Sequence, residues 1–232
     1  MKKYNNFIVT GCSFSSGVIN AHSTEHWKTA AFSWPHYCFL EMDPEHSQFL
    51  NFALPGGGNI AAMTNLVLYL EQHPDVTGSN TLVGLNITAL ERFDIICAPG
   101  APGTVYNLAA QHVTQELDIG WIHNQHSRHL KHSTSAGVQK SCISLIQAMV
   151  YLESKSIDYF FMLMTQDIYT YSPDWFKRFL DARTHHWVKF DSTIGMLEYI
   201  KKHELITDDL HPTRAGHGVL AGHVIKHLTN NE

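Results

Sequence analysis

The sequence has little positive charge and no Cys-x-x-Cys motif. Lys and Arg total 16 against 21 Asp and Glu in 232 residues, so the formal net charge is -5 and only 16% of residues are charged. Such a chain has no basic field to hold a phosphate backbone, and we expect no nucleic acid partner. The four cysteines are Cys12, Cys38, Cys97 and Cys142. Their spacing contains no Cys-x-x-Cys pair, which excludes a zinc ribbon, a redox motif or a small disulfide scaffold.

Long apolar runs are also missing. No stretch reaches the length that spans a bilayer, and we expect no membrane span. After Lys2 and Lys3 the apolar run covers only residues 7–9, too short for a secretory signal. We therefore expect a cytoplasmic protein with reduced thiols. Three glycines follow one another at 56–58, but no Gly-Lys-Ser or Gly-Lys-Thr comes after them, so the sequence does not support a P-loop.

What the chain does contain is an alternation of strands and helices. With 44% hydrophobic residues it is long enough for one α/β domain over residues 1–232. Strands are expected at 7–10, 49–54, 81–87 and 159–164, and helices at 34–42, 60–71, 139–154, from about Pro173 and at the C-terminus. Asn59 is expected to cap the helix at 60–71. The alternation predicts a mainly parallel sheet between helical layers, with its site at the carboxyl ends of the strands.

Residues 95–135 are the least regular part and are interpreted as an insertion or lid within that single domain. Histidines recur there every three residues, at His123, His126, His129 and His132. On a helix, a step of three residues turns about 300°, so the four side chains spread over half the circumference. At most two of them could share an ion, and no flanking carboxylate completes a ligand set. We therefore predict no metal.

Four separated blocks fall where one active site would need them. They are Gly11-Cys12-Ser13-Phe14-Ser15, residues 51–58, Gly84-Leu85-Asn86, and Asp208-Asp209-Leu210-His211-Pro212. Their order and spacing resemble the SGNH (GDSL-type) hydrolase family across nearly the whole chain, although Cys12 and Ile87 replace two aspartates of the family pattern. The resemblance implies a flavodoxin-like three-layer α/β/α sandwich with a mainly parallel sheet. It also implies ester hydrolysis without a cofactor.

The residue types in these blocks fit nucleophilic catalysis. A serine hydroxyl needs a neutral imidazole to take its proton and a carboxylate to orient that imidazole. Ser13 follows the first strand, and the family's Asp-x-x-His-Pro spacing assigns the other two roles to Asp208 and His211, with Asp209 as the rival carboxylate. The later histidines of the C-terminal segment, His217, His223 and His227, are expected to face solvent or to pack.

The resemblance also implies an oxyanion hole. Its donors would be the Ser13 backbone N–H, the Gly56 N–H and the side-chain amide of Asn86, with Gly57 as an alternative to Gly56. Cys12 is a rival nucleophile, but neighbouring residues of an extended segment face opposite ways, so Cys12 and Ser13 cannot both face His211.

The sequence therefore predicts a serine esterase that forms an acyl-serine intermediate. Its substrate would be a carboxylic ester of a small molecule, a carbohydrate or a lipid, with an O-acetyl or short acyl group. One alternative is an acyltransferase that passes the acyl group to a carbohydrate hydroxyl, which only acceptor-dependent product formation would distinguish. Another is a binding module that keeps the fold without turnover.

Overall fold

The centre of the molecule is a parallel sheet. The computed structural model describes residues 2–16, 32–42, 44–53, 57–76, 78–90, 93–96, 105–108, 134–191, 193–208 and 210–230. Within these, β1 (Asn6–Thr10), β2 (Gln48–Asn51), β3 (Thr81–Ile87) and β6 (Asp158–Leu163) form a four-stranded sheet in the order β2-β1-β3-β6. Every pairing is parallel. Strands β1 and β3 are buried along their whole length, as their apolar runs predict.

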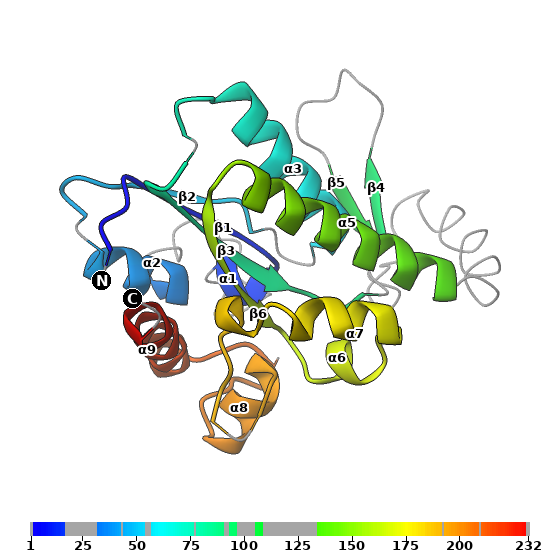
Figure 1. Ribbon diagram of the computed structural model, residues 1–232. Helices are drawn as coiled ribbons and strands as arrows, with labels where there is room; N and C mark the ends of the chain where they lie inside the picture. Colours follow the sequence, from blue (N-terminus) through cyan, green and yellow to red (C-terminus); the bar gives the residue numbers. More distant parts are fainter. Residues whose placement is uncertain are drawn as a thin grey trace.

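Helices cover both faces of this sheet. Helices α2 (Trp34–Glu41) and α9 (Arg214–Asn230) pack together on one face, and α3 (Asn59–Gln72) and α5 (Thr134–Ser154) on the other (Figure 1). Buried aromatic rings from different strands fill the space between the layers, as Phe7 of β1 and Phe160 of β6 do with ring centroids 6.4 Å apart. The predicted three-layer arrangement is therefore confirmed.

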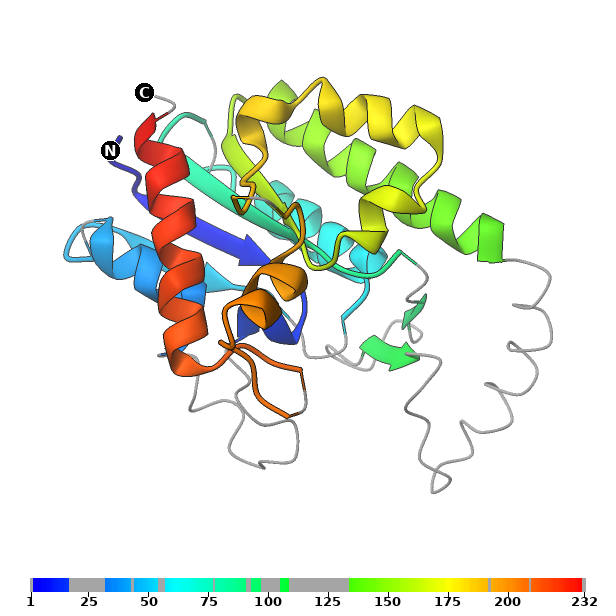
Figure 2. The same cartoon turned by 90° about the horizontal axis from the view of Figure 1, so that it is seen from below.

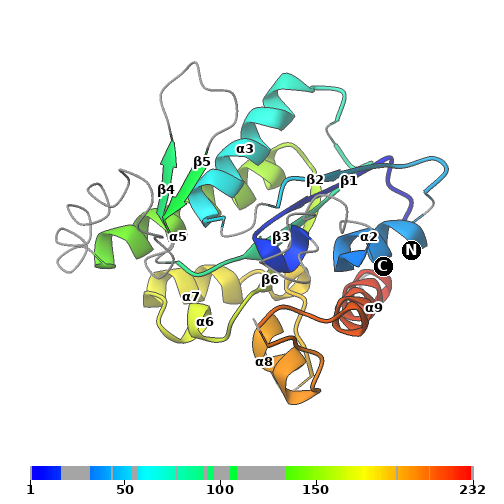
Figure 3. The same ribbon diagram turned by 180° about the vertical axis from the view of Figure 1, so that it is seen from behind.

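Short helices surround the β6 edge of the sheet (Figure 3). They are α6 (Asp167–Thr170), α7 (Asp174–Asp181), the 3-10 turn η3 (Thr184–His186) and α8 (Met196–Lys202). Helix α7 begins directly after Pro173, as predicted. Parallel bridges join Phe161 to Trp187 and Leu163 to Gly195, so the chain after α7 continues the sheet beyond β6.

Three expected boundaries are wrong. The cap of α3 is Gly58, and Asn59 is the first helical residue. The Asn59 amide instead donates to the Thr88 carbonyl oxygen (2.9 Å) and accepts from the Thr88 N–H (3.0 Å). These two bonds satisfy both backbone polar groups of Thr88, just after β3. A helix cap would satisfy only one backbone N–H with the same side chain. In addition, β2 ends at Asn51 and α5 begins at Thr134, five residues before its expected start.

The expected insertion is described only in part. Strands β4 (Phe93–Ile96) and β5 (Val105–Leu108) pair in antiparallel fashion there. The tract from His123 to His132 lies outside the described residues, so the lid stays a prediction. Within the described ranges, no helix is long and apolar enough to cross a membrane, and no group of His, Cys, Asp and Glu side chains could hold a metal ion.

Candidate active site

The sheet brings the first three sequence blocks together at one edge. Val9 pairs with Asn51 of β2, and Thr10 pairs with Leu85 of β3, so the carboxyl ends of the three strands are level. The four-residue helix α1 (Ser13–Ser16) starts just beyond β1 and lies at this edge (Figure 2). Binding sites of parallel sheets lie at the carboxyl ends of the strands. Here the polar side chains at these ends lie around Ser13.

Gly11 makes the close approach possible. Its φ of +142° is a conformation that L side chains rarely adopt, and a Cβ at this position would stand 2.8 Å from the Cβ of Asn86. Only glycine avoids both the strain and the collision. The chain can therefore turn directly over the end of β3, and the serine loop lies against Asn86.

Ser13 begins α1 and is 9% exposed. The Cys12 carbonyl oxygen accepts hydrogen bonds from the N–H groups of Ser15 (2.9 Å) and Ser16 (3.1 Å), which closes the short helical turn. The Ser13 hydroxyl makes no hydrogen bond to any other described residue. It is therefore not tied to a structural role, as a nucleophile requires.

The rival nucleophile at Cys12 is buried in the core. Its Sγ lies 3.5 Å from the Sδ of Met164, which follows β6, and the side chain is fully covered. The thiol thus points toward the β6 end of the sheet and packs as a small apolar group.

Ser15 connects the strand ends. Its Oγ accepts a hydrogen bond from Nδ2 of Asn86 (2.8 Å), and its carbonyl oxygen accepts one from Nδ2 of Asn51 (2.8 Å). Asn51 also accepts from the Ala53 N–H (3.0 Å). Asn86 is 1% exposed. The side chain predicted to bind an oxyanion is therefore held in a fixed place beside the serine loop.

His211 reaches the same edge from the other end of the chain. The Thr207 hydroxyl accepts from the His211 N–H (3.1 Å), while the Thr207 N–H donates to the His211 carbonyl oxygen (2.8 Å). A bridge between Ile206 and Pro212 closes this tight loop. The half-buried imidazole lies beside the serine loop, with its ring centroid 5.8 Å from that of Phe14.

Two predicted contacts are not made between described residues. No hydrogen bond joins the side chains of Ser13 and His211, and none joins Asp208 to His211. The Asp208 residue is exposed. Catalytic hydrogen bonds are often long without substrate and tighten when it binds. Gly56 and Asp209 lie outside the described residues, so their roles stay predictions.

His217 is a buried neighbour whose place the sequence left open between solvent and packing. Its Nδ1 accepts the N–H of Trp34 at the first turn of α2 (3.2 Å), and the side chain is fully covered. An accepting Nδ1 carries no proton, so the proton of the neutral ring is on Nε2. The pKa of His217 is lowered to about 4, mainly by burial and to a smaller extent by the charge of the nearby His211. The imidazole therefore stays neutral at pH 7 and links α9 to α2.

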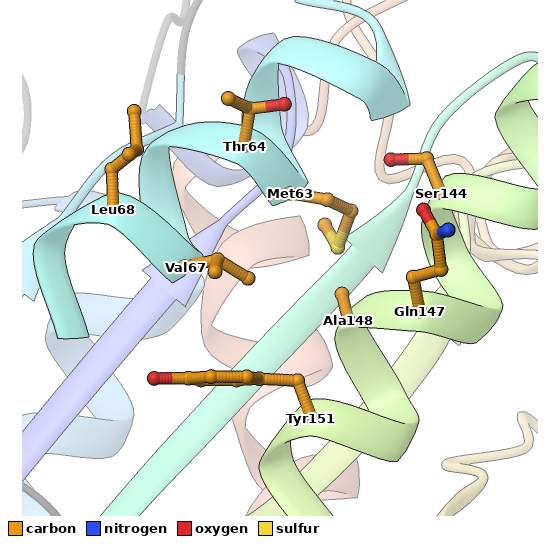
Figure 4. A pocket seen from close by; sticks show the side chains of 8 residues that line it. All are labelled: Met63, Thr64, Val67, Leu68, Ser144, Gln147, Ala148 and Tyr151. Carbon is orange, nitrogen blue, oxygen red and sulfur yellow. The ribbon is translucent and has the colours of Figure 1, made fainter. Parts of the chain in front are cut away.

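A separate groove of about 340 Å³ lies between α3 and α5. Figure 4 shows side chains of the two helices facing each other across it, with Met63 and Val67 from one and Ala148 and Tyr151 from the other. None of the predicted catalytic residues lines this groove. The candidate active site is therefore the strand edge around Ser13.

Several solved structures share this fold. The psychrotrophic esterase EstA from Pseudoalteromonas sp. is 15% identical, with a TM-score of 0.51 and 97% of each chain covered. TesA is 13% identical, with a TM-score of 0.51 and coverage of 98% of this chain and 99% of that one. A catalytic mutant of the acetylxylan esterase Axe2 from Geobacillus stearothermophilus is 12% identical, with a TM-score of 0.52 and coverage of 98% and 95%.

No protein-family model matches the sequence, and no curated protein matches it. The solved structures are SGNH (GDSL-type) proteins with a flavodoxin-like arrangement. At identities this low, the likeness establishes the fold. The chain thus has the SGNH hydrolase fold that its four sequence blocks predicted.

Proposed function

We propose that this chain, which has the SGNH hydrolase fold, is a serine esterase that cleaves carboxylic esters through an acyl-serine intermediate. The observation that carries the proposal is the meeting of an uncommitted serine hydroxyl, a buried asparagine amide and a half-buried imidazole at one edge of the sheet. These are the groups that acyl transfer needs: a nucleophile, an oxyanion donor and a base.

The proposed reaction has two halves. The neutral His211 imidazole takes the Ser13 hydroxyl proton as Oγ attacks the ester carbonyl carbon. The negative charge on the carbonyl oxygen is held by the Ser13 N–H, the Gly56 N–H and the Asn86 amide. Collapse of this intermediate expels the alcohol, which receives the proton from His211. Water then attacks the acyl-serine with His211 again as the base, and this step releases the acid and restores Ser13.

The substrate is proposed to carry a small acyl group. The acetylxylan esterase among the solved structures is named for acetyl ester cleavage, and p-nitrophenyl acetate is the simplest probe of that chemistry. Asp208 is proposed to orient His211. Asp208 is exposed, and substitutions of Asp208 and of the neighbouring Asp209 test which carboxylate has this role.

The test is covalent labelling with a fluorophosphonate, followed by identification of the modified residue. We expect an adduct on Ser13 and hydrolysis of p-nitrophenyl acetate, with both lost in Ser13→Ala and kcat lowered by about 10⁴ or more. Asp208→Asn should lower kcat by roughly 10³, whereas Asp209→Asn should leave it unchanged. The reverse result would move the orienting role to Asp209. A folded protein that gives no Ser13 adduct would contradict the proposal.

A further inference from the structure

We propose that Ser15 is a positioning residue that fixes the Asn86 amide for the oxyanion of the reaction, an inference that rests on the proposed function. Ser15 is fully buried, two residues after the proposed nucleophile. Its hydroxyl oxygen accepts a hydrogen bond from Nδ2 of Asn86 at 2.8 Å. Asn86 comes from the end of β3, so this bond ties the serine loop to the next strand.

An asparagine in an oxyanion hole must be oriented as well as present. The terminal torsion of its side chain is broad and roughly two-fold, and a half turn exchanges the N–H group for the carbonyl oxygen. In the wrong orientation, the carbonyl dipole would repel the developing oxyanion. A partner that accepts from Nδ2 selects the useful orientation before substrate arrives, which is the basis of electrostatic preorganisation.

Ser15 can hold that orientation because its own backbone is fixed from two other strands. Its N–H donates to the Cys12 carbonyl oxygen beyond β1 (2.9 Å), and its carbonyl oxygen accepts from Asn51 at the end of β2 (2.8 Å). A Cβ on Gly11 would come within 3.0 Å of the Ser15 Oγ, so the space around the hydroxyl is also closed. The ends of β1, β2 and β3 therefore all meet at this residue.

The hydrogen-bond count of Asn86 leaves capacity for a ligand. Its Nδ2 carries two hydrogens, of which one is directed to Ser15. Its Oδ1 is buried and has no hydrogen-bond partner in the described part of the chain. Buried polar groups are usually satisfied, and those that are not are concentrated where function requires them. A purely structural cross-link would be expected to satisfy both ends of the amide.

A double-mutant cycle on p-nitrophenyl acetate hydrolysis tests the role. Ser15→Ala should lower kcat by roughly 10- to 100-fold with little change in KM, because the oxyanion interaction is made in the transition state. In the Asn86→Ala background, the same change should alter kcat by less than about two-fold, since Ser15 acts through Asn86. Ser15→Cys, with a weaker acceptor of similar shape, should give an intermediate kcat and serves if Ser15→Ala does not fold.

Two controls separate this role from others. Thr81→Val removes another buried hydroxyl that accepts from an asparagine, at the opposite end of the same strands, and should leave kcat unchanged. The fluorophosphonate adduct should stay on Ser13 in Ser15→Ala. Full kcat in folded Ser15→Ala, or an equal loss with and without Asn86, would overturn the positioning role while Ser13 labelling upholds the esterase. A wild type that neither labels nor hydrolyses would overturn both.

Discussion

The two ends of the sheet carry the same kind of buried polar pair with different surroundings. At the amino ends of β1 and β3, Nδ2 of Asn6 donates to the Thr81 hydroxyl (3.2 Å). At the carboxyl ends of the same strands, Nδ2 of Asn86 donates to the Ser15 hydroxyl (2.8 Å). Only at the second end do buried side-chain oxygens lack a partner among the described residues, namely those of Thr10, Asn86 and Thr88.

The difference indicates what each end is for. A buried polar atom without a partner costs about 1–3 kcal/mol, so a sheet optimised for stability alone would avoid a group of them. The amino end is consistent with such a sheet. Among the described residues, the carboxyl end keeps unsatisfied oxygens next to an uncommitted serine hydroxyl and a glycine whose φ other residues rarely adopt, which is typical of a site that meets a ligand.

Replacing the asparagine at each end gives the sharpest contrast. Asn86→Ala should lower kcat by about 10²–10³, because one donor to the oxyanion is lost. Asn6→Ala should leave kcat unchanged and reduce the free energy of unfolding by about 1–3 kcal/mol, since it leaves the buried Thr81 hydroxyl unpaired. Kinetics with p-nitrophenyl acetate and urea unfolding of both variants check this. A loss of kcat in Asn6→Ala as large as in Asn86→Ala would remove the contrast.

The free energy of unfolding should fall in acid because of His217, which is buried near the carboxyl end of the sheet. Its pKa is lowered from 6.5 to about 4 in the folded protein by burial and by His211. Below pH 6.5 His217 binds a proton in the unfolded chain, whereas in the folded chain it stays neutral until about pH 4. The free energy of unfolding therefore falls as the pH decreases toward 4. Protonation would also place a proton on Nδ1, where the Trp34 N–H now donates. From pH 7 to pH 5 this one group should cost about 2 kcal/mol.

The variant His217→Gln isolates that contribution. Its side-chain oxygen can still accept from the Trp34 N–H, but it does not titrate. Urea unfolding at pH 7 and pH 5 should therefore show a smaller acid loss in His217→Gln than in the wild type, by about 2 kcal/mol. His203→Gln changes an exposed histidine and is the matched control. An equal acid loss in wild type and His217→Gln would show that other groups carry the effect.

Much of the fold could be predicted because its signals are local. The run at 7–10 followed by Gly11 marks a buried strand and the turn after it, and helical spacing marks α3 and α5. The parallel order then follows from the alternation of these elements. The blocks that contain Ser13 and Asn86 were predictable for the same reason, since each stands at a strand end that the pattern defines.

The remaining features depend on contacts between distant residues. Nothing near Asn59 indicates that its amide pairs with Thr88 instead of capping α3, because the partner is 29 residues away. Ser15 looks like any loop serine until Asn51 and Asn86 are placed beside it. The burial of His217 depends on where α2 lies, 183 positions earlier. Such long-range pairs leave no periodic pattern in the sequence, and only the packed strand ends make them visible.

The smallest expected effect lies at the amino end, where a surface ion pair joins the segment before β1 to the first residue of β6. Nζ of Lys2 lies 2.6 Å from Oδ2 of Asp158, with the two side chains 44% and 43% exposed. Water and salt screen a pair this open, so Lys2→Met should reduce the free energy of unfolding by less than about 1 kcal/mol. Added salt should narrow the difference from wild type, and kcat should not change. A change in kcat, with folding intact, would mean that the amino end also contributes to catalysis.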